Sequence, residues 1–292
     1  MKMKNVLLFL LISLLFLSPL FAESGEMETI TILGVEMEWD GYKVKESESD
    51  LDPYTTTFND IGEGRFFQVE YPVERESYSI NSGEYGETEV VHIHSLNPGP
   101  SIYIVAGVHG DERAAWYAGI MMGKATIKCG DLYILAPANK PGAERRNRYF
   151  YASQDLNRSF PGTVDGNRAE KMAYAIFQDI KRVEPEFVLD LHEAILYTEG
   201  RDFLGSTYIF SNLDLMADLF FNLLWATEDG EICHNAFSYT GPGPAGSINR
   251  TVTDELEIPV ITVETFRGFD IKRRVYDQLD SVQFVLKFYG MV

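Results

Sequence analysis

Cysteine is scarce in this sequence, because only Cys129 and Cys233 occur among the 292 residues. Neither a CxxC pair nor a Cys/His zinc-knuckle spacing is present, which excludes a structural cysteine-zinc site. Two cysteines allow one disulfide at most, and two buried free thiols fit the sequence about equally well. A chain of this length buries a substantial core without such cross-links.

Basic residues and long apolar runs are also few. The 25 lysines and arginines stand against 44 aspartates and glutamates, which gives a formal net charge of -19. This excess of negative charge makes nucleic acid and anionic membrane surfaces poor partners. Beyond the N-terminus, no segment is long and apolar enough to span a membrane. The composition is globular and predicts one large α/β domain or two small ones.

The N-terminus has the parts of a secretory signal peptide. Lys2 and Lys4 supply a basic start, an apolar run follows at residues 6–17, and the small residue Ala22 ends the segment. We expect residues 1–22 to direct export to the periplasm or the extracellular space and to be cleaved, leaving no membrane contact. An uncleaved membrane anchor is the alternative, although the apolar run is short for a spanning helix.

Residues 23–76 differ from the rest of the chain. Apolar and polar side chains alternate around the turn signal Asp40-Gly41, which predicts a β-hairpin of Val35–Trp39 with Tyr42–Val44. Residues 46–64 are polar and acidic without periodicity, and they are interpreted as a loop or a partly ordered arm. The sequence therefore predicts an N-terminal arm over residues 23–76 and a separate domain over residues 77–292.

From residue 77 the pattern becomes regular. Short apolar runs typical of buried strands alternate with amphipathic helical patterns. This alternation predicts a single α/β domain whose mainly parallel, mixed central sheet is flanked by helices. Active sites in such sheets lie at the carboxyl ends of the strands. The predicted strands are 102–106, 132–136, 187–191, 207–210 and 260–263, and the predicted helices are 114–123, 168–181, 213–226 and 273–288.

Side chains that can bind metal follow two of these strands. His109 and Glu112 lie three residues apart where strand 102–106 runs into a turn, and His192 ends strand 187–191. A turn lets an imidazole and a carboxylate at this spacing converge on one point. Two histidines and a glutamate with an open fourth position are typical of a catalytic rather than a structural zinc site. The helical HExxH arrangement is excluded, since Leu196 occupies its last position.

Two further segments carry ionisable groups. One is Asp155-Leu-Asn-Arg-Ser-Phe-Pro-Gly162, and the other is a buried apolar strand that contains Glu264. An ionisable group in a buried strand is costly unless it is paired or functional. A structural ion pair, of Glu264 with Arg267 or of Arg158 with Asp155, is the alternative for each segment. The first segment is preceded by a basic cluster of Arg145, Arg146 and Arg148.

His92 and His94 lie outside this constellation. They are two residues apart on one face of a predicted strand. A second metal site is one interpretation of that spacing, but the exposed face of a hairpin strand is the simpler one. We therefore leave both residues out of the predicted site.

Together these motifs resemble the zinc carboxypeptidase superfamily. Its landmarks are H-G-D-E after a strand, D-L-N-R-x-F-P, D-L-H at a later strand end and a glutamate that closes the last core strand. They stand here, in that order, at residues 109–112, 155–161, 190–192 and 264. The pattern is most similar to the succinylglutamate desuccinylase/aspartoacylase branch. The resemblance covers residues 77–292 and implies that this segment is the catalytic domain.

The resemblance implies a role for each matching residue. His109, Glu112 and His192 match the ligands of a single zinc ion per chain. Glu264 matches the general base, which takes a proton from the attacking water and delivers it to the leaving nitrogen. Asp155 matches a carboxylate that orients the first zinc-binding histidine.

The same comparison implies how substrate is bound. Asn157 and Arg158 match residues that hold the substrate carboxylate, for which a planar guanidinium is well shaped. Arg148 is the best match to the arginine that polarises the scissile carbonyl, ahead of its neighbours in the basic cluster. Tyr239, which precedes a Gly-Pro-Gly-Pro segment, is the candidate for the mobile tyrosine of the family.

The function implied by the resemblance is a zinc-dependent hydrolase that cleaves an amide bond next to a substrate carboxylate. The substrate is expected to be a small molecule or a peptide. An exported metallocarboxypeptidase that acts on peptides or cell-wall peptides is the alternative within the same chemistry. A non-catalytic, zinc-stabilised binding module is the alternative of another class, and the presence of Glu264, Asn157 and Arg158 argues against it.

Overall fold

The computed structural model describes residues 28–39, 51–195 and 204–292. The chain divides into two compact units, residues 1–45 and 46–292. The predicted signal segment, residues 1–22, lies outside the described residues. Within the described ranges, no helix has both the length and the apolar character needed to cross a membrane.

The first unit contains a β-hairpin, but its strands are not the predicted pair. Strand β1 (Glu28–Ile32) pairs antiparallel with β2 (Val35–Trp39). The two-residue turn is Leu33-Gly34, with φ of 48° and 79°, as a hairpin of this loop length requires. Val35–Trp39 is therefore the second strand of the hairpin rather than the first. The predicted partner Tyr42–Val44 lies outside the described residues.

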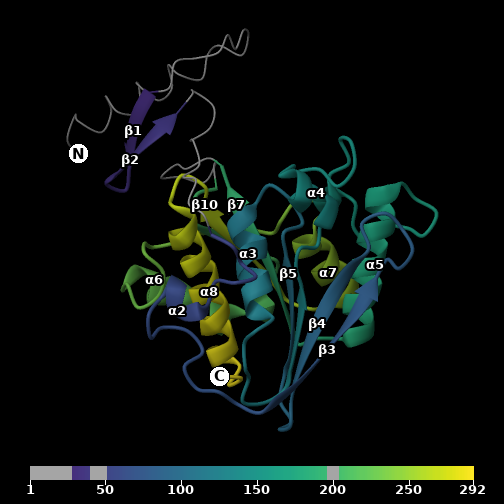
Figure 1. The fold of residues 1–292 in the computed structure, drawn as a ribbon, viewed down its shortest axis with the longest axis horizontal. Coiled ribbons are helices and arrows are strands. Elements are labelled where there is room, and N and C mark those ends of the chain that lie inside the picture. Colours follow the sequence, from purple (N-terminus) through teal and green to yellow (C-terminus); the bar gives the residue numbers. More distant parts are fainter. Residues whose placement is uncertain (1–27, 40–50, 196–203) are drawn as a thin grey trace. The chain divides into compact units, whose positions relative to one another are not determined.

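The second unit is built on an eight-stranded mixed sheet of order β3-β4-β6-β5-β7-β10-β8-β9 (Figure 1). The central run β6-β5-β7-β10 is parallel. Strand β4 pairs antiparallel with both β3 and β6, and β8 pairs antiparallel with β10 but parallel with β9. The predicted fold class is thus confirmed. The strands are β3 (Val73–Ile80), β4 (Thr88–Ser95), β5 (Ser101–Ala106), β6 (Asp131–Leu135), β7 (Phe187–Ala194), β8 (Thr207–Phe210), β9 (Ser238–Thr240) and β10 (Val260–Phe266).

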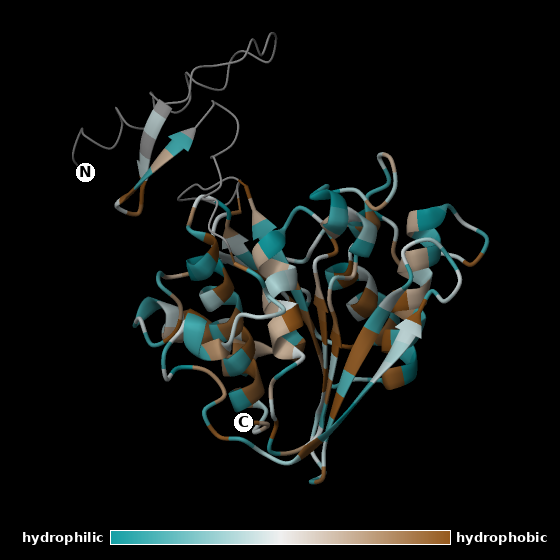
Figure 2. Cartoon of the chain, viewed as in Figure 1, coloured by the Kyte–Doolittle hydropathy of each residue, from teal (hydrophilic) through white to brown (hydrophobic). Residues whose placement is uncertain are grey.

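Helices cover both faces of this sheet and enclose two hydrophobic cores. In Figure 1, α3, α6 and α8 lie on one face, and α5 and α7 lie on the other. The central strands are the most apolar part of the fold (Figure 2), and every residue of β7 is buried. The helices are α2 (Phe58–Ile61), α3 (Arg113–Met122), α4 (Lys140–Arg145), α5 (Arg168–Val183), α6 (Ala217–Glu228), α7 (Ile248–Leu256) and α8 (Ile271–Phe288).

The second compact unit begins before residue 77, the predicted boundary of the domain. Strand β3 starts at Val73, and the compact unit already includes residue 46. Ile61 and Phe66 are buried in the core on the α8 side of the sheet. Thr57 caps α2 through a reciprocal capping box with Asp60. The stretch predicted to be a loose acidic arm therefore packs, from residue 51 on, as part of the domain.

The two cysteines are both free, so they do not form a disulfide. The thiol of Cys129 donates a hydrogen bond to the Gly290 carbonyl. The thiol of Cys233 lies 3.5 Å from the Ser281 hydroxyl. Burial raises the pKa of the Cys233 thiol well above its ordinary value.

Candidate active site

The predicted metal ligands come from the carboxyl ends of two neighbouring parallel strands. His109 lies in the turn after β5, and His192 lies near the end of β7. Gly107 has a φ of 75°, which opens the turn. A Cβ on Gly110 would lie only 2.0 Å from the backbone of Gly142, so the turn can pack against α4 only with glycine there. The turn ends at Glu112, the residue that precedes α3.

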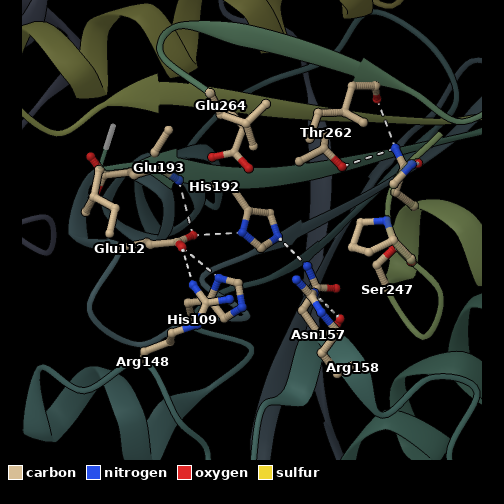
Figure 3. A pocket seen from close by; sticks show the side chains of 17 residues that line it. His109, Glu112, Arg148, Asn157, Arg158, His192, Glu193, Ser247, Thr262 and Glu264 are labelled. Atoms are coloured by element: carbon tan, nitrogen blue, oxygen red, sulfur yellow. Dashed lines mark hydrogen bonds and ion pairs between the residues drawn. The ribbon is translucent and has the colours of Figure 1, made fainter. Parts of the chain in front are cut away.

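The three side chains converge in a buried cluster (Figure 3). Glu112 Oε1 lies 2.6 Å from His109 Nδ1, and Glu112 Oε2 lies 2.7 Å from His192 Nδ1. All three residues are less than 5% exposed. One ligand atom from each residue lies within 4.8 Å of the other two. The structure therefore brings the three predicted ligands together.

The far side of each imidazole is held by a second carboxylate. His109 Nε2 lies 3.2 Å from Asp155 Oδ1, and His192 Nε2 lies 3.0 Å from Asp190 Oδ1. A histidine that ligates metal through one nitrogen characteristically donates its other N–H to such a group. Both rings thus present Nδ1 to the cluster and Nε2 to an orienting aspartate. Two imidazoles and one carboxylate so arranged fit the donor set of a catalytic zinc site.

The charges in the cluster favour a bound cation. Burial alone lowers the pKa of His192, but Asp190 and Glu112 outweigh it and raise the pKa well above its ordinary value. Burial alone lowers the pKa of His109 as well, and Glu112 and Asp155 likewise outweigh it. Burial alone raises the pKa of Glu112, but the two histidines hold it well below its ordinary value. The cluster therefore holds positive charge strongly, whether as protons or as a metal ion.

Glu264 faces this cluster from the adjacent strand. It lies in β10 in register with His192, and its carboxylate points towards Glu112 and His192 (Figure 3). Its Oε2 atom is buried and accepts no hydrogen bond from the described residues. Burial raises the pKa of Glu264 to about 7. Arg267, the alternative ion-pair partner, instead donates from Nη1 to Asp111 Oδ2 at 3.0 Å.

Asp155 connects the cluster to one arginine of the basic segment. Arg148 Nη2 donates to Asp155 Oδ2 at 3.0 Å, and Arg148 Nη1 lies 3.5 Å from Glu112 Oε1. Arg145 is directed elsewhere, to the Tyr85 hydroxyl and the Phe150 carbonyl. Of the three arginines in that segment, Arg148 is the one that lines the cavity at the cluster.

Asn157 and Arg158 lie beside the histidines on a short 3-10 turn. Asn157 Nδ2 lies 3.4 Å from His192 Nε2, and Asn157 Oδ1 accepts a hydrogen bond from Ile248 N. The exposed guanidinium of Arg158 donates from Nη1 to the Asn157 carbonyl at 2.7 Å. It forms no salt bridge within the described part of the chain, so the alternative pair with Asp155 is not made.

Comparison with known proteins identifies the family. The model of the succinylglutamate desuccinylase/aspartoacylase catalytic domain matches residues 98–264, which is more than half of the chain. The chain belongs to this family. No curated protein matches the sequence.

Solved structures with this fold include two members of the same group. A succinylglutamate desuccinylase from Silicibacter sp. TM1040 has 17% identity and a TM-score of 0.56, over 77% of this chain and 72% of that one. An aspartoacylase family protein from Mesorhizobium loti has 19% identity and a TM-score of 0.57, over 78% of this chain and 70% of that one. A variant of the cell shape determinant protein from Helicobacter pylori has 16% identity and a TM-score of 0.58, over 70% of this chain and 55% of that one. At these identities the likeness shows the shared fold.

The site of this desuccinylase/aspartoacylase family member opens into a cavity of about 320 Å³. Several residues that sequence reasoning missed belong to it. Asp190 lies behind His192 and orients its imidazole. An aspartate inside an otherwise apolar strand is the sequence feature that could have indicated this role. Asn249 donates to the Ile209 carbonyl and accepts from Gly243 N, which fixes the loop at the cavity wall. Ser247 and Thr262 also line the cavity, and no motif in the sequence indicates them.

Asp155 contacts His109 from behind, whereas Tyr239 is a predicted site residue that the structure brings neither to this cavity nor to the cluster. It lies on the edge strand β9 and is 53% exposed. Its ring packs edge-on against Phe220, with 5.0 Å between the ring centroids. It lines a different cavity, together with Pro242.

Proposed function

We propose that this protein is a zinc-dependent hydrolase that cleaves an amide bond adjacent to a substrate carboxylate. The observation that carries the proposal is the buried convergence of His109, Glu112 and His192 beside Glu264, whose buried Oε2 atom has no hydrogen-bond partner among the described residues. Zinc, when bound to these three ligands, supplies a Lewis acid that polarises a carbonyl and acidifies water. Family membership supports hydrolysis of this type.

The side chains of the site suit the remaining steps. Glu264, with a pKa of about 7, is matched to accept a proton from the attacking water and to deliver it to the leaving nitrogen at neutral pH. Arg148 lines the cavity and can donate to the carbonyl oxygen as negative charge develops there. Asp155 and Asp190 hold the two imidazoles in the orientation that ligation requires.

The substrate is expected to carry a carboxylate that binds at Arg158 and Asn157. The Arg158 guanidinium lines the cavity and pairs with no carboxylate of the described residues, so its bidentate face suits an anionic group of a small molecule or a peptide. Because the protein has a formal net charge of -19, an anionic substrate needs a local positive group such as Arg158 to bind in the cavity. Export by the N-terminal segment is proposed on its sequence alone.

A panel assay tests the reaction. The zinc-loaded protein is offered N-acyl amino acids and short peptides with free carboxylates, and Glu264→Gln serves as the matched control. Cleavage of acyl amino acids supports the deacylase, whereas release of C-terminal residues from peptides supports the metallocarboxypeptidase alternative. If neither class is cleaved, or if Glu264→Gln cleaves as fast as the wild type, the proposal is rejected.

A further inference from the structure

A second group of potential metal ligands lies at the opposite end of the sheet. His92 and His94 come from β4, and Asp131 is the first residue of β6. Cross-strand register pairs His94 with Asp131 and His92 with Tyr133. Because β6 runs parallel to β5, its first residue lies at the amino ends of these strands. His109 follows the carboxyl end of β5, so the two groups are separated by the length of the strands.

The three side chains focus on one point. Asp131 Oδ1 lies 2.7 Å from His92 Nε2 and also 2.7 Å from His94 Nδ1. One ligand atom from each of the three residues lies within 4.8 Å of the others. Two imidazole nitrogens and one carboxylate oxygen are the same donor set that the buried cluster offers. This set suits zinc and related divalent transition metals.

Glu76 supplies the orienting contact that a metal-ligating histidine characteristically has. It lies on β3 in register with His92, and its Oε1 atom is 3.1 Å from His92 Nδ1. If Nδ1 donates its proton to Glu76, neutral His92 turns the lone pair of Nε2 towards Asp131 Oδ1. Two lone pairs at 2.7 Å repel each other unless a proton or a cation lies between them. A metal ion shared by His92, His94 and Asp131 removes this repulsion without an added proton.

The site is both ordered and accessible. The His92 ring stacks on Tyr133, with 4.2 Å between the centroids and 5° between the planes. Tyr133 stacks in turn beside Tyr103 in the core, so little conformational freedom remains for His92 to lose on binding. The side chain of His94 is 49% exposed and that of Asp131 is 28% exposed. Solvent can therefore reach the ligand atoms and complete the coordination.

We propose that His92, His94 and Asp131 bind a second divalent transition metal ion of the zinc class. Glu76 orients His92, and water fills the remaining positions. The ion joins β4 to β6 at the amino end of the sheet, away from the substrate cavity. The proposal replaces the interpretation of the two histidines as a plain exposed strand face, and it raises the expected zinc content from one to two per chain.

The histidines of the chain provide a complete set of variants for the test. The full-length protein is stripped with a chelator, dialysed against buffered zinc and analysed for metal content. We expect two zinc ions in the wild type, one in His94→Ala and one in Asp131→Ala. His192→Ala should keep the ion of the second site while losing that of the first.

His234 is the matched control for nonspecific binding. Its Nδ1 atom lies 2.7 Å from Asp277 Oδ1, but the described residues offer it no third ligand. His234→Ala should therefore keep both ions. Circular dichroism establishes that each variant is folded, and Asp131→Ala substitutes for His94→Ala if the latter is not. The proposal is overturned if folded His94→Ala and Asp131→Ala both bind as much zinc as the wild type, or if the wild type binds a single ion that His192→Ala loses.

Discussion

The orienting role of Asp190 leads to a sharp prediction about zinc affinity. Asp190 is fully buried, and its Oδ1 atom lies 3.0 Å from His192 Nε2. Its Oδ2 atom accepts a hydrogen bond from the Thr262 hydroxyl. The substitution Asp190→Asn keeps the size of the side chain and replaces the carboxylate oxygen beside Nε2 with a neutral amide oxygen. It removes only the negative charge from the contact behind the ligand.

The expected loss is that of a charged acceptor beside Nε2–H replaced by a neutral one, once zinc ligation at Nδ1 orients the ring. A bond to a charged group contributes about 1.5–3 kcal/mol net, whereas a neutral one contributes about 0.5–1.5 kcal/mol. The difference of about 1–2 kcal/mol corresponds to a rise of about 5- to 30-fold in the zinc dissociation constant. Loss of a contact behind a metal ligand typically costs about 10- to 100-fold in affinity, so the two figures overlap. The direction is the same in both, because a carboxylate makes the imidazole a stronger ligand.

Competition titration with a chromophoric chelator measures this affinity directly. Asp179→Asn is the matched control, since Asp179 is another buried aspartate that accepts hydrogen bonds from Tyr78 and Tyr103, outside the cavity. The proposed second zinc site is removed from the measurement with a His94→Ala background. Unchanged zinc affinity in Asp190→Asn, or an equal loss in Asp179→Asn, would refute the orienting role.

Four further outcomes are expected. Metal analysis of His192→Ala should show that the zinc of the buried cluster is lost, and its retention would reject the ligand assignment. Glu264→Gln should keep zinc but turn over about 10²–10⁴-fold more slowly; near-normal rates would mean that another group accepts the proton. Arg158→Ala should lower kcat/KM for free-carboxylate substrates by an amount equivalent to about 2–5 kcal/mol of transition-state stabilisation, and should lower it much less for amidated analogues. If the wild type cleaves both kinds of substrate equally well, Arg158 does not bind a substrate carboxylate. The Cys233 thiol is partly exposed, but desolvation raises its pKa, so it should react with iodoacetamide more slowly in the folded than in the denatured protein; equal rates would contradict the raised thiol pKa.

The two histidines of the buried cluster and Glu264 could be predicted because each lies at or near the end of an apolar run, and Glu112 follows His109 by three residues. Such a run fixes both the strand and the edge of the sheet at which it ends. His109 and His192 follow two runs of this kind, and Glu264 lies in a third. The structure adds what local patterns cannot contain, which is the strand order β5-β7-β10 that makes these three ends neighbours. The resemblance to a known family implied that these residues share a site, but it did not give the strand order.

Other features depend on contacts that leave no local pattern. Asp190 sits in a strand where its carboxylate interrupts an apolar run, and only the pairing of its side chain with His192 reveals its role. Ile61 and Phe66 lie in a polar stretch whose few apolar residues follow no helical or strand period, so their burial against the domain has no periodic signal. Tyr239 lies on a three-residue edge strand that exists only by pairing with β8. Its distance from the cavity is set by this pairing and not by its spacing from Glu264.

The balance of charge at the cavity explains why these residues form one unit. Four carboxylates, of Glu112, Asp155, Asp190 and Glu264, lie in or behind the cluster, against two imidazoles and the guanidinium of Arg148. Buried carboxylates are costly unless each is compensated. Three of them are compensated by the imidazoles and the arginine, while burial instead raises the pKa of Glu264 to about 7. Glu264 Oε2 has no hydrogen-bond partner in the described ranges, which is costly for stability and suits the proposed exchange of a proton with the substrate. The Glu112 carboxylate that faces both Nδ1 atoms likewise favours a divalent cation over a neutral ligand between them.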